Sequence, residues 1–202
     1  MNNFNNDNNN TFLPPHKKSS RSITFRLDSS IVDELQRDAN QNEISLNVLV
    51  NKILRMYVEW GRYEHKLGMM PVPQNFFSSL IQETIRLAES NGISIDPYKE
   101  KLIKYSAEIA FYNIKESVIL MRKKFDLWSV LSVLQEYMKV SGITSDHRIE
   151  EGKKHTFIIQ HELGENWSLF AKELLNIIFY NLANVRAEIN ITQKSIIAEV
   201  II

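Results

Sequence analysis

The stretch Arg21-Ser-Ile-Thr-Phe-Arg-Leu-Asp28 decides how the first third of the chain is expected to fold. From Ser22 to Leu27, apolar and polar residues alternate strictly, which is the pattern of a strand with one buried face. A strand must pair its backbone groups, yet the next convincing strand does not begin until Lys154. We therefore expect this strand to pair with the same strand of a second copy, as a two-stranded antiparallel ribbon.

Two helices are predicted after the strand. Asp28 is a suitable N-cap for a first helix that begins at Ser29 or Ser30 and ends near Gln41. Ser45 is a suitable N-cap for a second helix that runs to about Lys66 and is apolar around most of its circumference. Such a helix should be buried on most sides, which favours an intertwined dimer over a helix enclosed in a larger monomeric domain.

The order of strand, cap, helix, tight turn and longer helix resembles the ribbon-helix-helix transcription factors of the Arc/MetJ/CopG type, over about residues 21–63. The resemblance implies a homodimer whose paired strands enter the major groove of double-stranded DNA. Many members of that family have Gly or Asn at the turn position that Glu43 holds here, where a positive φ is often needed. Asn42 could take that role one residue earlier.

Residue roles follow from this resemblance. Arginine can pair with a guanine edge and threonine can contact several bases, so the predicted base contacts are Ser22, Thr24 and Arg26. Basic residues before the ribbon and the start of the second helix can hold phosphates, so the predicted phosphate contacts are Lys17, Lys18, Arg21, Ser45 and Asn47. The predicted dimer core is Ile23, Phe25, Leu27, Leu35, Leu49, Ile53 and Tyr57.

Composition sets outer limits on these interpretations. The chain has 202 residues, of which 44% are apolar and 24% charged, and its formal net charge is zero. Any affinity for nucleic acid must therefore come from a local basic patch such as the one between Lys17 and Arg26. No apolar run is long enough for a membrane span, and the chain has no cysteine. We expect a cytoplasmic protein that does not contact a membrane.

The remaining residues predict a second domain. Residues 1–20 are expected to be a disordered Asn-rich and basic arm, residues 21–66 the DNA-binding and dimerisation module, and residues 67–73 a linker. Residues 74–202 are expected to be a mainly helical α+β sensor or assembly domain. Its predicted order is three helices (74–90, 98–124 and 127–142), a polar loop (143–152), a strand from Lys154, a helix (167–182) and a hairpin around Gln193-Lys194.

Three of the five histidines, His147, His155 and His161, lie within 15 residues of one another. His155 and His161 would be about 20 Å apart along a strand, too far to share a metal within one chain, so no metal site is predicted. We instead expect His161 to be hydrogen-bonded at a strand end and His155 to lie at an exposed edge. His161 and Trp167 could line a ligand pocket beside the turn at Gly164. No catalytic motif is present, so neither enzyme activity nor a cofactor is expected.

The sequence thus predicts a homodimeric, sequence-specific DNA-binding regulator of transcription, acting as a repressor. Its C-terminal α+β domain would sense a small-molecule effector or extend the homo-oligomer. The alternative is an antitoxin-like or assembly protein, in which the first module mainly dimerises and the C-terminal domain binds a protein partner.

Overall fold

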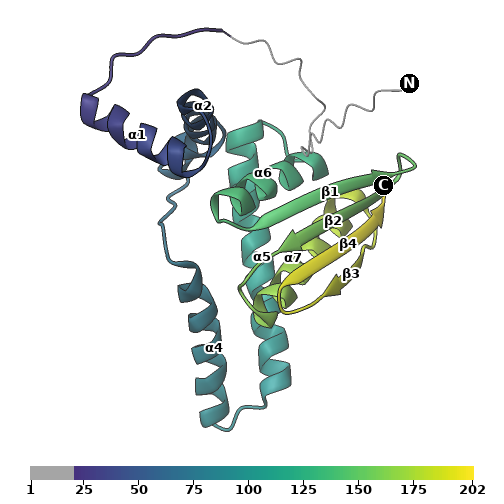
Figure 1. Ribbon diagram of the computed structural model, residues 1–202. Coiled ribbons are helices and arrows are strands. Elements are labelled where there is room, and N and C mark those ends of the chain that lie inside the picture. The colour runs from purple at the N-terminus through teal and green to yellow at the C-terminus, as the bar shows by residue number, and fades with distance from the viewer. Residues whose placement is uncertain (1–20) are drawn as a thin grey trace. The chain divides into compact units, whose positions relative to one another are not determined.

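A computed structural model describes residues 21–202, apart from the side chains of Gln74 and Phe77. The predicted arm over residues 1–20, with Lys17 and Lys18, lies outside the described residues. Of the described chain, residues 21–69 belong to one compact unit and residues 70–202 to another (Figure 1). The two units are described separately.

The first unit is helical. Its elements are α1 (Ser29–Gln41), α2 (Leu46–Met56), the single π-helical turn η1 (Tyr57–Gly61) and the short α3 (Arg62–Glu64). Ser45 caps α2 as predicted, because its side chain accepts a hydrogen bond of 3.3 Å from the Val48 N–H. Asp28 stands at the N-cap position of α1, but its side chain makes no capping hydrogen bond.

The turn between α1 and α2 places its positive φ on Glu43. Glu43 has a φ of 55°, whereas Asn42 has a φ of −91°, so the expectation that Asn42 takes this role is wrong. The Ile44 N–H donates to the Ala39 carbonyl at 3.0 Å, which closes the end of α1. A residue with a Cβ is therefore held in a conformation that glycine adopts more easily.

The predicted strand over residues 22–27 is wrong. Residues 21–28 have no regular secondary structure, and every strand in the described part of the chain lies between Thr144 and Ile201. The alternation of side chains favours a strand only where another edge is available for pairing, and residues 21–69 of one chain offer none. The predicted fold class, a ribbon-helix-helix module followed by an α+β domain, is therefore contradicted.

Apolar side chains of the first unit are mostly exposed. Within residues 21–69, the buried residues are Ala39 and Trp60. Helix α2, predicted to be buried on most sides, has no buried residue. In the predicted dimer core, Leu35 and Leu49 are half-buried, and five side chains are exposed: Ile23 (68%), Phe25 (58%), Leu27 (52%), Ile53 (39%) and Tyr57 (60%). Their assignment to a dimer core stays a prediction.

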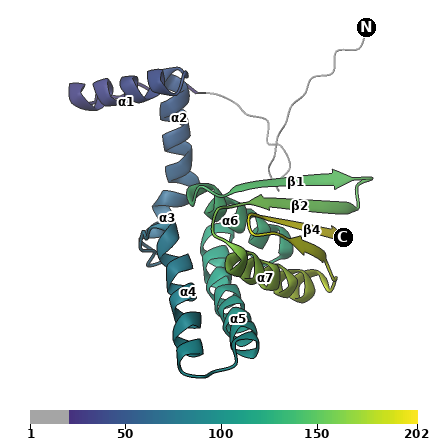
Figure 2. The same ribbon diagram turned by 60° about the horizontal axis from the view of Figure 1, so that its bottom comes forward.

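The second unit contains four longer helices. These are α4 (Gln74–Ser90), α5 (Ile95–Arg122), α6 (Leu127–Val140) and α7 (Glu165–Ala183), and α4 runs beside α5 (Figure 2). Asp126 caps α6 as predicted, because its carboxylate accepts from the Ser129 N–H at 2.8 Å. None of the helices within residues 21–202 is long and apolar enough to cross a membrane.

The strands form one antiparallel sheet in the order β1-β2-β4-β3. They are β1 (Thr144–Glu150), β2 (Lys154–Gln160), β3 (Glu188–Ile191) and β4 (Ser195–Ile201). The predicted loop over residues 143–152 is therefore wrong in most of its length, since β1 pairs with β2 along seven residues. The inward-facing positions of β1 include Ser145 and His147, so this strand lacks the apolar alternation that marks β2.

Helices α6 and α7 pack against one face of this sheet (Figures 1 and 2). Phe157 and Ile196 point to that face and are buried, together with Ile178 and Phe179 of α7. Each such side chain contributes about 1.5–3 kcal/mol of burial free energy. The other face bears ion pairs, such as Lys154 with Glu199 at 2.9 Å. The core thus lies between the sheet and the helices, and fixes the segment that joins β2 to α7.

Candidate functional site

The segment between β2 and α7, residues 161–164, is held by backbone geometry at both ends. The His161 N–H donates to the Lys194 carbonyl at 2.9 Å, so the segment starts beside the turn of the β3–β4 hairpin. Gly164 ends it with a φ of 81°, a conformation that residues with a Cβ rarely adopt. Ser78 of α4 donates to the Leu163 carbonyl at 3.0 Å from the other side.

His161 anchors a buried hydrogen-bond network. Its Nδ1 lies 3.1 Å from the Leu163 N–H and accepts that proton, so the ring proton of a neutral His161 is on Nε2. Nε2 donates to the Ser168 Oγ at 2.9 Å, and the Ser168 hydroxyl donates to the Thr192 carbonyl at 2.6 Å. Ser168 is fully buried and His161 is 6% exposed. The predicted hydrogen-bonded role of His161 at a strand end is confirmed.

This network does not have the polarity of a catalytic pair. A nucleophilic serine needs a base that accepts its proton, whereas here the Ser168 proton goes to the Thr192 carbonyl and His161 is the donor. Burial lowers the pKa of His161, which keeps the ring neutral. The Trp167 ring lies 4.4 Å from the His161 ring, centre to centre, and is tilted against it. The arrangement fixes the segment rather than activating a group.

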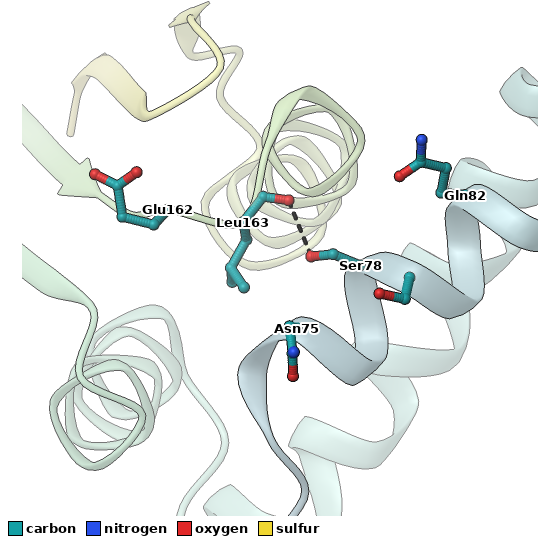
Figure 3. A pocket seen from close by; sticks show the side chains of 6 residues that line it. Asn75, Ser78, Gln82, Glu162 and Leu163 are labelled. Carbon is teal, nitrogen blue, oxygen red and sulfur yellow. Dashed lines mark hydrogen bonds between the residues drawn. The ribbon is translucent and has the colours of Figure 1, made fainter.

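A hollow of about 480 Å³ lies between this segment and α4 (Figure 3). Four uncharged polar residues of α4 line it at positions i, i+3, i+4 and i+7, one face of the helix, opposite Glu162 and Leu163: Asn75, Ser78, Ser79 and Gln82. The sequence-based interpretation missed these four residues. Their helical spacing is readable from the sequence, but nothing in it shows which distant segment they face.

A second hollow, of about 420 Å³, lies on the sheet side of the same segment. It is lined by Gly142, Ile143, Thr144, Gln160, His161, Glu162, Leu163, Lys194 and Ser195. Of the predicted pocket pair, His161 lines this hollow, while Trp167 packs on the His161 ring. Glu162 and Leu163 line both hollows. The Glu162 carboxylate pairs with the Lys194 ammonium at 2.6 Å, and both side chains are well exposed.

The other two clustered histidines, His147 and His155, form a separate pair beside Trp128 of α6. The His147 Nε2 lies 2.9 Å from the His155 Nδ1, and the His147 ring stacks on Phe157 with centroids 4.4 Å apart. Trp128 of α6 lies 5.1 Å from the His155 ring. Burial and then the neighbouring His155 lower the pKa of His147 to about 4, against an opposing effect of Asp146. His155 is buried, so its predicted exposed edge position is wrong.

The residues predicted to contact DNA lie in the first unit. Arg21, Ser22, Thr24 and Arg26 are exposed in the irregular segment before α1. Ser45 is used as the cap of α2, and Asn47, in the first turn of that helix, accepts hydrogen bonds from the Asn51 side-chain amide. The ribbon on which their predicted roles depended is not formed.

No protein-family model matches this chain, and no curated protein matches it either. Among solved structures, the Fe(II) unliganded H-NOX protein from K. algicida aligns with a TM-score of 0.44 and 17% sequence identity, over 66% of this chain and 76% of that one. A single-substitution mutant of the same H-NOX protein gives the same values. A likeness at this level carries no argument about function.

Within residues 21–202, no group of three or more His, Cys, Asp or Glu side chains is placed to hold a metal ion. The His147–His155 pair offers two ring nitrogens.

These findings contradict the predicted function. A homodimeric DNA-binding repressor that inserts paired strands into the major groove needs a strand that residues 21–28 do not form. The antitoxin-like or assembly alternative loses its support too, since it required the same dimerising ribbon. Double-stranded DNA is accordingly withdrawn as a partner.

Proposed function

We propose that residues 70–202 form a non-catalytic domain that binds a small polar ligand at the two hollows beside Glu162 and Leu163. The observation that carries this proposal is that two hollows, of about 480 and 420 Å³, share these two residues. Both volumes lie within the range of ligand sites in proteins, roughly 300–1,000 Å³. Most such sites are mainly apolar, whereas most of the residues that line these two hollows are polar or charged, with Ile143 and Leu163 as the larger apolar ones, so we expect a polar ligand.

The rigidity of the segment supports binding. The His161–Ser168–Thr192 network and the Ser78–Leu163 hydrogen bond fix its backbone before any ligand arrives. A preorganised site loses less conformational freedom on binding than a mobile one. The absence of catalysis remains a prediction, and the donor polarity of His161 supports it. A cytoplasmic location likewise stays part of this proposal.

Nuclear magnetic resonance on the uniformly ¹⁵N-labelled full chain tests the proposal. The panel consists of L-glutamine, myo-inositol and spermidine, each titrated to about 1 mM, where half-saturation corresponds to about 4 kcal/mol of binding free energy. We expect at least one compound to shift the amide signals of residues 75–82 and 162–163 saturably. If none of the three produces such a shift, the proposal is wrong.

A matched pair of variants locates the binding. Gln82→Leu removes an amide that lines the first hollow, and it should weaken the bound compound about tenfold, as expected for one lost hydrogen bond. Gln41→Leu removes an exposed amide at the end of α1 in the other unit and should leave the affinity unchanged. Equal affinities in the two variants would place the binding elsewhere.

A further inference from the structure

The two hollows contain one negative and one positive side chain among neutral ones. Glu162 lines both hollows and Lys194 lines the second. Burial lowers the pKa of His161 and keeps its ring neutral, and the remaining lining residues carry no charge. From this charge arrangement we infer that the ligand is a zwitterion, a free α-amino acid with an uncharged polar side chain. This inference rests on the proposed function and names the ligand class for the same site.

Glu162 and Lys194 stand on hydrogen-bonded backbone, and their charged ends are exposed. The Lys194 N–H donates to the Thr192 Oγ1 at 3.1 Å, and the Lys194 carbonyl accepts from the His161 N–H at 2.9 Å. The side chains of Lys194 and Glu162 are 70% and 75% exposed. Their ion pair of 2.6 Å joins the β3–β4 turn to the segment between β2 and α7. An exposed ion pair of this kind contributes little to stability, so a ligand can separate its members at small cost.

A bound zwitterion compensates for the loss of the Glu162–Lys194 ion pair. Its ammonium group pairs with the Glu162 carboxylate, and its carboxylate pairs with the Lys194 ammonium, so that one ion pair becomes two. A ligand with a single charge would leave Glu162 or Lys194 without its partner. A neutral polyol would have no reason to separate them.

The ligand side chain lies toward α4. The first hollow is lined by Glu162 and by the face of α4 that bears Asn75, Ser79 and Gln82. Amides and hydroxyls on this face can both donate and accept hydrogen bonds, and they match an amide or hydroxyl side chain. These side chains are exposed, so an aliphatic ligand side chain would lose only the net value of their hydrogen bonds. We therefore expect L-leucine to bind about two- to tenfold more weakly than L-glutamine.

The test compares L-glutamine with two derivatives that each lack one charge. L-glutaminamide has no carboxylate and N-acetyl-L-glutamine has no ammonium group. Calorimetry and the resonance titration of the full chain should give about two- to fivefold weaker binding for each derivative, as expected for the loss of one exposed ion pair. Glu162→Gln should remove the preference for L-glutamine over the N-acetyl derivative, and Lys194→Met should remove the preference over the amide.

A control variant and the remaining outcomes separate this inference from the proposed function. Glu199→Gln breaks an ion pair of similar length on the other face of the sheet and should leave binding unchanged. If L-glutamine and its derivatives shift residues 75–82 and 162–163 with equal affinity, the zwitterion inference is wrong and the binding site stands. If only myo-inositol or spermidine binds, the zwitterion inference is likewise wrong and the binding site stands. If no compound shifts these residues, both proposals fail.

Discussion

Acidification should destabilise the second unit through the His147–His155 pair. The pKa of His147 is lowered from an ordinary value of 6.5 to about 4 in the folded chain, because the half-buried ring is desolvated and lies beside His155. Between pH 6.5 and about 4, His147 binds a proton in the unfolded chain but stays neutral in the folded chain. The free energy of unfolding therefore falls as the pH falls toward about 4. The difference of about 2.5 pKa units corresponds to about 3 kcal/mol, since one unit is about 1.4 kcal/mol.

Urea unfolding of the full chain measures this loss, with the amide signals of β1 and β2 as the readout for the second unit. Between pH 6.5 and about 4, the unfolding free energy should fall more steeply in the wild type than in His147→Gln, by up to about 1.4 kcal/mol per pH unit. His65→Gln changes an exposed histidine of the other unit and should leave the unfolding of β1 and β2 as in the wild type. Equal slopes for the wild type and His147→Gln would refute the reasoning.

Three further changes test separate contacts. Ser168→Ala removes the partner of both the His161 Nε2–H and the Thr192 carbonyl, and it should cost about 2–4 kcal/mol in urea unfolding, whereas a loss below about 1 kcal/mol would mean that water replaces the hydroxyl. Glu43→Gly relieves a positive φ of 55° and should stabilise the first unit by about 1 kcal/mol, measured by its thermal midpoint; a decrease would contradict the turn geometry. Phe25→Ser changes a side chain that is 58% exposed and should alter stability by less than about 0.5 kcal/mol, while a large and concentration-dependent loss would show that Phe25 is covered by another chain.

Local signals predicted the second unit well. Asp126 and the apolar residues after it gave α6 its start, because a cap and the helix that it begins are adjacent in the sequence. The same holds for Gln74–Ser90, which has the predicted bounds. Helix α5 begins at Ile95, three residues before its predicted start, since Pro97 is tolerated in a first helical turn. These predictions needed no information about distant contacts.

Predictions that depended on a distant or absent partner were wrong. The alternation from Ser22 to Leu27 is compatible with a strand, but a strand exists only where a second edge accepts its hydrogen bonds. In β1 the reverse occurred: Ser145 and His147 give no apolar alternation, yet β2 supplies an edge and the strand forms. Backbone pairing, more than side-chain pattern, decided both cases.

The candidate site was only partly predictable for the same reason. His161 was recognisable because it stands at the end of an alternating strand, next to Gly164. The α4 side of the first hollow was not recognisable, because the hydrogen bond from Ser78 to Leu163 joins residues 85 positions apart in the sequence. A site formed by two segments this far apart is visible only once the chain is folded.

The strand order β1-β2-β4-β3 has a consequence for how the second unit folds. Each of its two hairpins is local in sequence and can form within about 1–10 μs, but the central pairing of β2 with β4 must wait until α7 has brought the second hairpin back. Until then β2 presents an open edge that contains Phe157, Ile158 and Ile159, which is a template for aggregation. Substitutions that delay α7 should therefore lower the yield of folded protein before they lower the stability of the folded state.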